Sequence, residues 1–277
     1  RENPPFVNVT TAPYDLHIQT TVPTQLEAGG TPVSTPLSIT DDYDGNTRNA
    51  TTPDVGADEG AFTPAVPMSY VSSNVTQVTG NAFLGVNNQE IIRIEIVTTG
   101  TANPLTVSDF TVNAVGTTDI SDIDATKSGI YYTGTVSTFG TSFLFGEEIP
   151  TEVDYTIIGS QTLSEGTNYF WLANNVKAGA TPGNVIDGEC NSITIDGNPE
   201  IPTTTAPAGN KIIVGPMSGN YSVGQGISYP GFATITEALL NLNNRSVSGP
   251  VNLILTNTVS VPYNIANGES FPLTLNV

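Results

Sequence analysis

The segment around the single tryptophan constrains the fold of this chain most strongly. Residues 169–173 read YFWLA, so Tyr169 and Trp171 point to one side of an extended backbone, and Phe170 and Leu172 point to the other. Both sides are apolar, and a strand that is apolar on both sides must be covered on both. We therefore predict that this segment is a central strand of a β-sheet.

The surrounding sequence predicts further short strands. Residues 178–184, AGATPGN, predict a turn, because glycine allows positive φ and proline cannot donate to a sheet ladder. An extended pattern resumes at 185–195. Earlier in the chain, the residues over 92–97 read IRIEIV, in which isoleucines alternate with Arg93, Glu95 and Val97, as in a half-buried strand with a polar outer face. About eight such runs lie between 66 and 195, which favours an antiparallel β-sandwich of jelly-roll type.

Several separated phrases in this region resemble one known module. They are NPLTVSDFTVNAVGTTDISDI at 103–123, IYYTGTVSTFGTSFLFG at 130–146, GTNYFWLANNV at 166–176 and GNVIDGECNSITI at 183–195. Together they resemble the sialidase (BNR-repeat)-associated N-terminal domain of secreted Bacteroidota proteins, over 66–199. The resemblance implies a β-sandwich that is an accessory, glycan-facing domain. It brings no catalytic residues with it.

Residues 1–64 resemble the last coils and cap of a secreted right-handed parallel β-helix. The phrases that carry the resemblance are short extended segments at 6–7 and 16–18, DYDGNTR at 42–48 and PDVGADE at 53–59. We expect the two extended segments to lie in stacked coils and not in a hairpin. A proline-containing linker at 62–68 then leads into the sandwich.

Two local signals follow the sandwich. Residues 200–208 contain proline and threonine without apolar periodicity, which predicts an extended linker between domains. Further on, Thr234 and Glu237 have the spacing of a helix capping box. The apolar residues of the predicted helix share one face, which must be buried. They are Ile235, Leu239 and Leu242.

Residues 209–277 resemble the N-terminal cap and first coils of a second parallel β-helix, with strands at 251–255 and 273–277. The predicted fold class is therefore all-β: a jelly-roll-type sandwich flanked by partial parallel β-helix segments, with one short capping helix. Coils of a solenoid stack on their neighbours, so such a chain is expected to be one segment of a much longer protein.

The charge balance excludes some partners. With 26 acidic and seven basic residues, the net charge is −19, which repels nucleic acid and anionic membrane surfaces.

No window reaches the roughly 18 apolar residues of a membrane helix, so membrane insertion is not expected. The secreted families that the chain resembles imply an extracellular or cell-surface location. The partners expected are neighbouring domains of the same long chain, surface glycans or other copies.

Calcium is the one cofactor that the sequence suggests. The candidate ligands alternate along the chain and are Asp42, Asp44 and Asn46. They match the first half of an EF-hand loop, but Pro53 occupies the position of its bidentate glutamate. We favour an Asx-type turn at Gly45 with Arg48 paired to a nearby acid. The acids within reach are Asp54, Asp58 and Glu59.

Three other features have ordinary structural interpretations. Asp119, Asp122 and Asp124 could hold calcium, but we favour a solvated acidic loop. His17 is the only histidine, and a single histidine on a strand is expected to be packed or solvated. Cys190 is the only cysteine, and we expect a small buried apolar residue in place of a nucleophile.

The sequence predicts a protein that is not an enzyme, because it contains no nucleophile elbow, phosphate loop or zinc-binding motif. The first hypothesis is a structural or adhesive repeat segment of a very long secreted surface protein, such as an adhesin or a gliding or attachment filament. The alternative is an accessory glycan-binding module of a secreted glycosidase or polysaccharide lyase. Aromatic residues would then stack on sugars, although core packing is the competing interpretation. The candidates are Tyr131, Tyr132, Tyr169 and Trp171.

Overall fold

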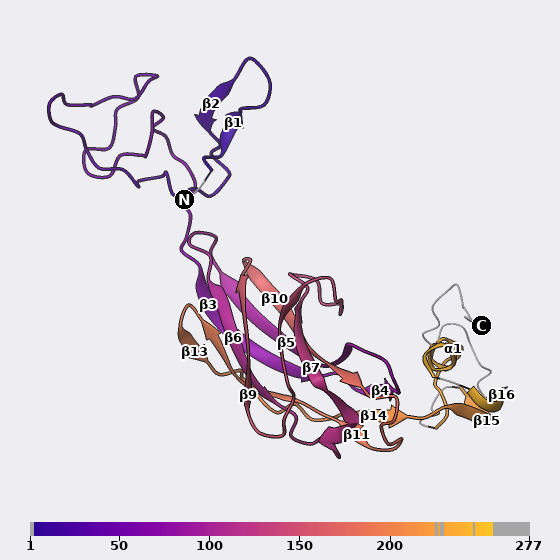
Figure 1. Ribbon diagram of the computed structural model, residues 1–277. Helices are drawn as coiled ribbons and strands as arrows, with labels where there is room; N and C mark the ends of the chain where they lie inside the picture. The colour runs from indigo at the N-terminus through magenta and orange to yellow at the C-terminus, as the bar shows by residue number, and fades with distance from the viewer. Residues whose placement is uncertain (1–2, 225–226, 228–229, 246, 257–277) are drawn as a thin grey trace.

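The computed structural model describes residues 3–224, 227, 230–245 and 247–256 (Figure 1). A loop-rich segment at 3–64 is followed by a β-sandwich and then by a C-terminal part that contains the helix. In Figure 1 the loop-rich segment lies beyond one end of the sandwich and the helix lies near the opposite end. The structure is mostly β with one short α-helix, which confirms the predicted class in outline.

The first sheet of the sandwich has five antiparallel strands. In spatial order they are β3 (Ser69–Gln77), β5 (Gln89–Thr99), β10 (Gly166–Val176), β7 (Ile123–Tyr132) and β8 (Leu144–Glu148). β10 contains the YFWLA run and lies between β5 and β7, as its two apolar faces predicted. Phe170 and Leu172 belong to the buried core cluster of the sandwich, whereas Trp171 between them does not.

The second sheet has four strands. In spatial order they are β13 (Asn198–Glu200), β12 (Glu189–Ile195), β6 (Thr106–Asn113) and β9 (Tyr155–Thr162). Aromatic rings contact one another across the two sheets. The ring centroid of Phe110 in β6 lies 5.0 Å from that of Phe170 in β10 and 5.1 Å from that of Phe145 in β8. This apolar contact between inner faces is what makes the two sheets a sandwich.

A third, smaller sheet extends the sandwich toward the C-terminal part. It consists of β11 (Val185–Ile186), β14 (Lys211–Val214) and β4 (Gly80–Phe83), with β14 parallel to β4. Ile213 of β14 lies in the sandwich core. The stretch predicted as a linker is hydrogen-bonded to the first sheet, because the Thr203 amide donates to the Ser73 carbonyl of β3 (2.8 Å). The sandwich therefore includes residues beyond 208.

The N-terminal strands β1 (Phe6–Asn8) and β2 (Asp15–Ile18) pair in antiparallel fashion. The expectation that they lie in stacked coils is wrong, because Asn8 organises a chain reversal between them. Its Oδ1 accepts from the amides of Thr10 (3.2 Å) and Thr11 (3.3 Å), and its Nδ2 donates to the Pro13 carbonyl (3.0 Å). A side chain that bonds the backbone next to it favours a turn over a continued strand.

The predicted helix is present as α1 (Ile235–Asn244), and the described chain contains no helix that is long and apolar enough to cross a membrane. Thr234 Oγ1 accepts from the Glu237 amide (3.0 Å), and Glu237 accepts from the Ala233 amide (2.9 Å), as expected of a capped start. Ile235 and Leu242 pack against a small core that includes Phe232.

The remaining strands, β15 (Met217–Val223) and β16 (Val247–Leu255), are parallel to each other. β16 includes the predicted strand at 251–255, whereas the strand predicted at 273–277 lies outside the described residues. In the described part of the chain this sheet has two strands, so a parallel β-helix is not established.

Cys190 of β12 is fully buried, in agreement with its predicted role as a small apolar core residue. Burial raises the pKa of its thiol well above the usual range. Because the thiolate is the reactive form, we expect the folded chain not to react with a disulfide reagent such as DTNB, whereas the urea-unfolded chain reacts fully. Absorbance at 412 nm measures the reaction, and rapid stoichiometric reaction of the folded chain would contradict this assignment.

Candidate functional site

The outer face of the first sheet carries three of the aromatic candidates. Tyr169 and Trp171 of β10 and Tyr131 of β7 lie on the side away from the core cluster. The loop between β7 and β8 folds over this face: Thr133 Oγ1 accepts from Trp171 Nε1 (3.0 Å), and the Phe139 ring lies 5.7 Å from the Trp171 ring. Trp171 and Tyr131 are therefore only 6% and 8% exposed.

The structure separates the four glycan candidates. Tyr132 points inward, with its ring 4.7 Å from Phe170 and its hydroxyl donating to Asn168 Oδ1 (2.7 Å). Tyr131 and Trp171 are covered by the loop, and a covered ring cannot stack on a sugar. Tyr169 is half-buried on the outer face, so it is the candidate that keeps accessible ring surface there.

Charged groups surround Tyr169. The Arg93 guanidinium of β5 lies 5.7 Å from the Tyr169 ring centroid and 5.9 Å from the Trp171 ring centroid, within the range of cation–π contacts. One of its nitrogens pairs with Glu95 Oε1 at 2.6 Å. Glu95 is also directly opposite Tyr169 in the strand register. Aromatic surface, hydrogen-bond donors and an acceptor are therefore adjacent on this face.

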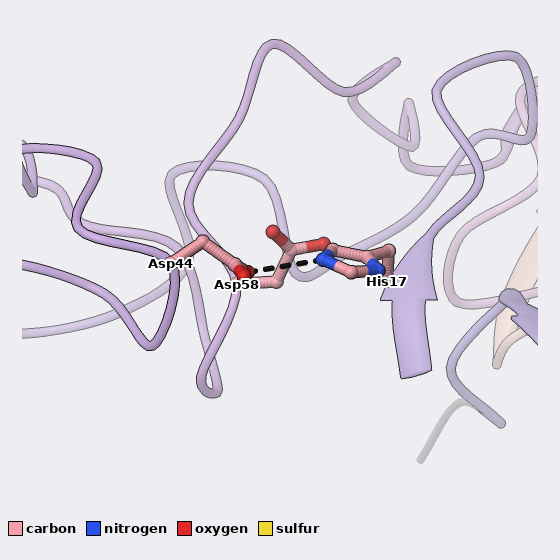
Figure 2. Close-up of side chains that lie close together, drawn as sticks. All are labelled: His17, Asp44 and Asp58. Atoms are coloured by element: carbon pink, nitrogen blue, oxygen red, sulfur yellow. Dashed lines mark hydrogen bonds and ion pairs between the residues drawn. The ribbon is translucent and has the colours of Figure 1, made fainter. Parts of the chain in front are cut away.

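The N-terminal segment contains a second candidate group of polar side chains, shown in Figure 2. His17 Nε2 lies 3.0 Å from Asp44 Oδ2, and His17 Nδ1 lies 2.6 Å from Asp15 Oδ1. One ligand atom each from His17, Asp44 and Asp58 lie within 4.8 Å of one another. The hydrogen bonds to Asp15 and Asp44 raise the pKa of His17. The sequence did not reveal this group, because its members are far apart along the chain.

Asp42, the first predicted calcium ligand, accepts hydrogen bonds from four donors. Its Oδ1 accepts from the amides of Asp44 (2.9 Å) and Asn46 (2.7 Å). Its Oδ2 accepts from Asn46 Nδ2 and from the Glu59 amide, both at 3.0 Å. The bond from the Asn46 side chain contributes most to lowering the pKa of Asp42 to about 2. This is the Asx-type turn that we favoured, and a calcium site at Asp42, Asp44 and Asn46 stays a prediction.

The ion pair expected beside this turn is also present. Arg48 Nε lies 3.6 Å from Glu59 Oε2, and the Arg48 guanidinium also donates to the carbonyls of Asp54 and Gly56. Both side chains of the pair are largely covered. Gly45 has a φ of +86°, which the turn requires and which glycine adopts without strain.

The acidic loop before β7 is only in part the solvated loop that we expected, because Asp119 is exposed and Asp124 is half-buried. Asp122 is buried, and its carboxylate accepts from the Thr181 amide (2.9 Å) and from Asn184 Nδ2 (2.7 Å). Asp119 caps the 3₁₀ turn η1 (Ile120–Asp122) through the Ser121 amide (2.9 Å). Asp122 therefore holds the turn that follows β10 and does not face solvent.

Residues 71–199 match the family model described as the N-terminal domain of BNR-repeat neuraminidase. Over this range the sandwich is similar to that neuraminidase domain. The resemblance predicted from the sequence is confirmed over this range, and the matched range includes β10 with the Trp171 face. It includes neither the His17 group nor α1. The match therefore concerns the sandwich alone, and the segments before and after it lie outside the matched range.

Two solved structures illustrate the comparison. The Hadza microbial sialidase Hz136 is 12% identical, with 51% of this chain and 30% of the sialidase covered and a TM-score of 0.38. The second structure is the CssB subunit of colonization factor CS6 from enterotoxigenic Escherichia coli, complemented with a donor strand from CssA. It is 10% identical, the match covers 51% of this chain and 97% of the CssB chain, and the TM-score is 0.25. This chain thus spans less than a third of the sialidase. No curated protein matches it.

Proposed function

We propose that this chain is an accessory, non-catalytic part of a larger secreted glycosidase-like protein. The observation that carries the proposal is the match of residues 71–199 to a neuraminidase N-terminal domain. This favours the glycosidase-module hypothesis over the adhesin hypothesis. The other parent enzyme considered, a polysaccharide lyase, is not favoured by this match, because the matched family is described as a domain of neuraminidases.

The proposed glycan contact is the Tyr169 face of the first sheet. The Tyr169 ring offers apolar surface for a sugar ring. Arg93 supplies N–H donors and Glu95 supplies carboxylate acceptors for hydroxyl groups, and the two side chains are 31% and 25% exposed. A few convergent polar groups beside an apolar surface are typical of small-ligand sites.

A repeat segment of a long surface protein is the second candidate. Two observations favour this candidate. β15 is parallel to β16, and the two strands share a small core with α1. A parallel pair of strands next to a capping helix is expected at the start of a longer β-helix. In this proposal the sandwich is a jelly-roll-type spacer, the flanks are β-helix pieces, and neighbouring domains of the same chain or other copies are the partners. Both candidates place the protein outside the cell or on its surface.

Glycan binding by the whole chain tests the first proposal. We expect saturable binding to at least one glycan on an array. We expect Tyr169→Ala to weaken it at least about tenfold, or about 1.4 kcal/mol, because the ring surface that would stack on the sugar is lost. Isothermal titration calorimetry measures the affinity. The matched control is Tyr14→Ala, which removes an exposed tyrosine from the N-terminal segment.

Two results would count against this proposal. One is the absence of saturable binding to any glycan. The other is a Tyr169→Ala variant that binds with the affinity of the unmodified chain, which would move the contact away from this face. Circular dichroism of each variant shows whether the fold is retained.

A further inference from the structure

The His17 group has the composition of a metal site. It combines one imidazole nitrogen with the carboxylates of Asp44 and Asp58, which converge from three separate segments of the chain (Figure 2). We propose that His17, Asp44 and Asp58 bind a divalent transition-metal ion, with Zn²⁺ as the best fit. The proposal concerns the N-terminal segment and is independent of the proposed glycan contact.

The spacing of the ligand atoms suits a small ion. Zinc bonds nitrogen and oxygen at about 2.0–2.2 Å, so tetrahedral ligand atoms lie about 3.4 Å apart. Here Nε2 of His17 and Oδ2 of Asp44 are already 3.0 Å apart, and the three ligand atoms lie within 4.8 Å of one another. Small side-chain rotations are enough to bring them into coordination range. His17 and Asp44 are 56% and 40% exposed, so a water molecule can supply a fourth ligand.

Asp15 orients the imidazole. Its Oδ1 lies 2.6 Å from His17 Nδ1, so in a zinc-bound neutral ring Nδ1 would keep its proton and donate to Asp15, and Nε2 would supply the lone pair. Nε2 is the atom that faces Asp44. A carboxylate behind the histidine is the usual outer partner of a histidine that binds zinc. Asp15 is therefore a positioning residue for the site.

Backbone contacts hold the ligand segments together. Asp58 Oδ2 accepts from the Ile18 amide at 2.7 Å, which joins it to the strand that carries His17. The Tyr43 amide donates to the Ala57 carbonyl at 3.1 Å, which joins the residues that precede Asp44 and Asp58. Little reorganisation of the backbone is then needed for binding, and preorganisation of this kind favours affinity.

The donor set favours a transition metal over calcium. Calcium takes six to eight oxygen ligands, whereas this group offers two carboxylates and one nitrogen. Imidazole is a preferred ligand of zinc and its neighbours. In the absence of a metal, a protonated His17 can form ion pairs with the same carboxylates. The experiments must therefore distinguish coordination from simple attraction to an acidic surface.

Calorimetry of the EDTA-treated whole chain with zinc chloride is the first test. We expect one site that His17→Gln and Asp58→Asn each weaken at least about tenfold, with Asp15→Asn producing a loss of about 10–100-fold. The matched control is Asp41→Asn, which removes an exposed acidic charge three residues before Asp44 without removing a ligand. Equal zinc affinity in His17→Gln and the unmodified chain would overturn the proposal, because general attraction to the net charge of −19 would then account for binding.

Nuclear magnetic resonance provides a second test that needs no substitution. His17 is the only histidine, so its imidazole signals need no assignment. In a long-range ¹H–¹⁵N spectrum we expect zinc to shift Nε2 while Nδ1 remains protonated, and we expect calcium at the same concentration to leave both unchanged. Imidazole signals that do not change at saturating zinc, or that change equally with calcium, would overturn the proposal.

Discussion

Replacing Trp171 with alanine is expected to lower the free energy of unfolding by about 3–5 kcal/mol, the usual cost of removing a large buried aromatic ring. Trp171 is 6% exposed and lies under the β7–β8 loop. Its ring contacts Phe139, its Nε1 donates to Thr133, and Arg93 lies over its face. Alanine would leave a cavity and remove one of the hydrogen bonds that join the loop to the sheet.

Unfolding in urea tests this expectation. Trp171 is the only tryptophan, so its fluorescence is lost in the variant and far-ultraviolet circular dichroism must follow the transition. The control is Tyr43→Ala, since Tyr43 is 88% exposed and its loss should change stability by no more than about 0.5 kcal/mol. A Trp171→Ala variant that kept its unfolding midpoint but lost glycan binding would show that Trp171 contacts the ligand.

Gly146→Val is expected to destabilise the sandwich by about 3 kcal/mol, at the upper end of the usual cost of overpacking. Gly146 lies in β8, an edge strand of the first sheet, next to β9 of the second sheet. A Cβ atom at Gly146 would lie 2.2 Å from the Ile158 carbonyl oxygen. A Cβ atom at Gly159 would lie equally close to the Phe145 carbonyl, at 2.3 Å. Because backbone meets backbone here, no flexible side chain can move aside.

Thermal melting measures the effect. For a unit of this size, about 3 kcal/mol corresponds to a decrease of roughly 6–12 °C in melting temperature. Gly140→Val is the matched control, because the nearest atom to a Cβ there, Cγ2 of Thr133, is at an ordinary contact distance of 3.8 Å. If Gly146→Val and Gly140→Val melted at the same temperature, the close approach of β8 and β9 would not contribute to stability.

Features that depend on near neighbours along the chain could be predicted from the amino-acid sequence. The alternation around Trp171 was enough to predict a central strand, and the Thr234–Glu237 spacing was enough to predict the capped helix. The turn at Gly45 was also predicted, because an Asx turn involves residues only a few positions apart. The pairing of Arg48 with one of three nearby acids was predicted as well, and the structure selects Glu59. The separated phrases of the sandwich identified its family.

Which of these segments contact one another depends on packing between distant parts of the chain. Periodicity places Tyr169 and Trp171 on one face, but the β7–β8 loop determines that Trp171 is buried whereas Tyr169 is half-buried. The pairing of β14 with β4 and the meeting of His17 with Asp44 and Asp58 join segments far apart along the chain. Such contacts leave no local pattern in the sequence, because they form only when packing compensates the entropy lost in closing long loops.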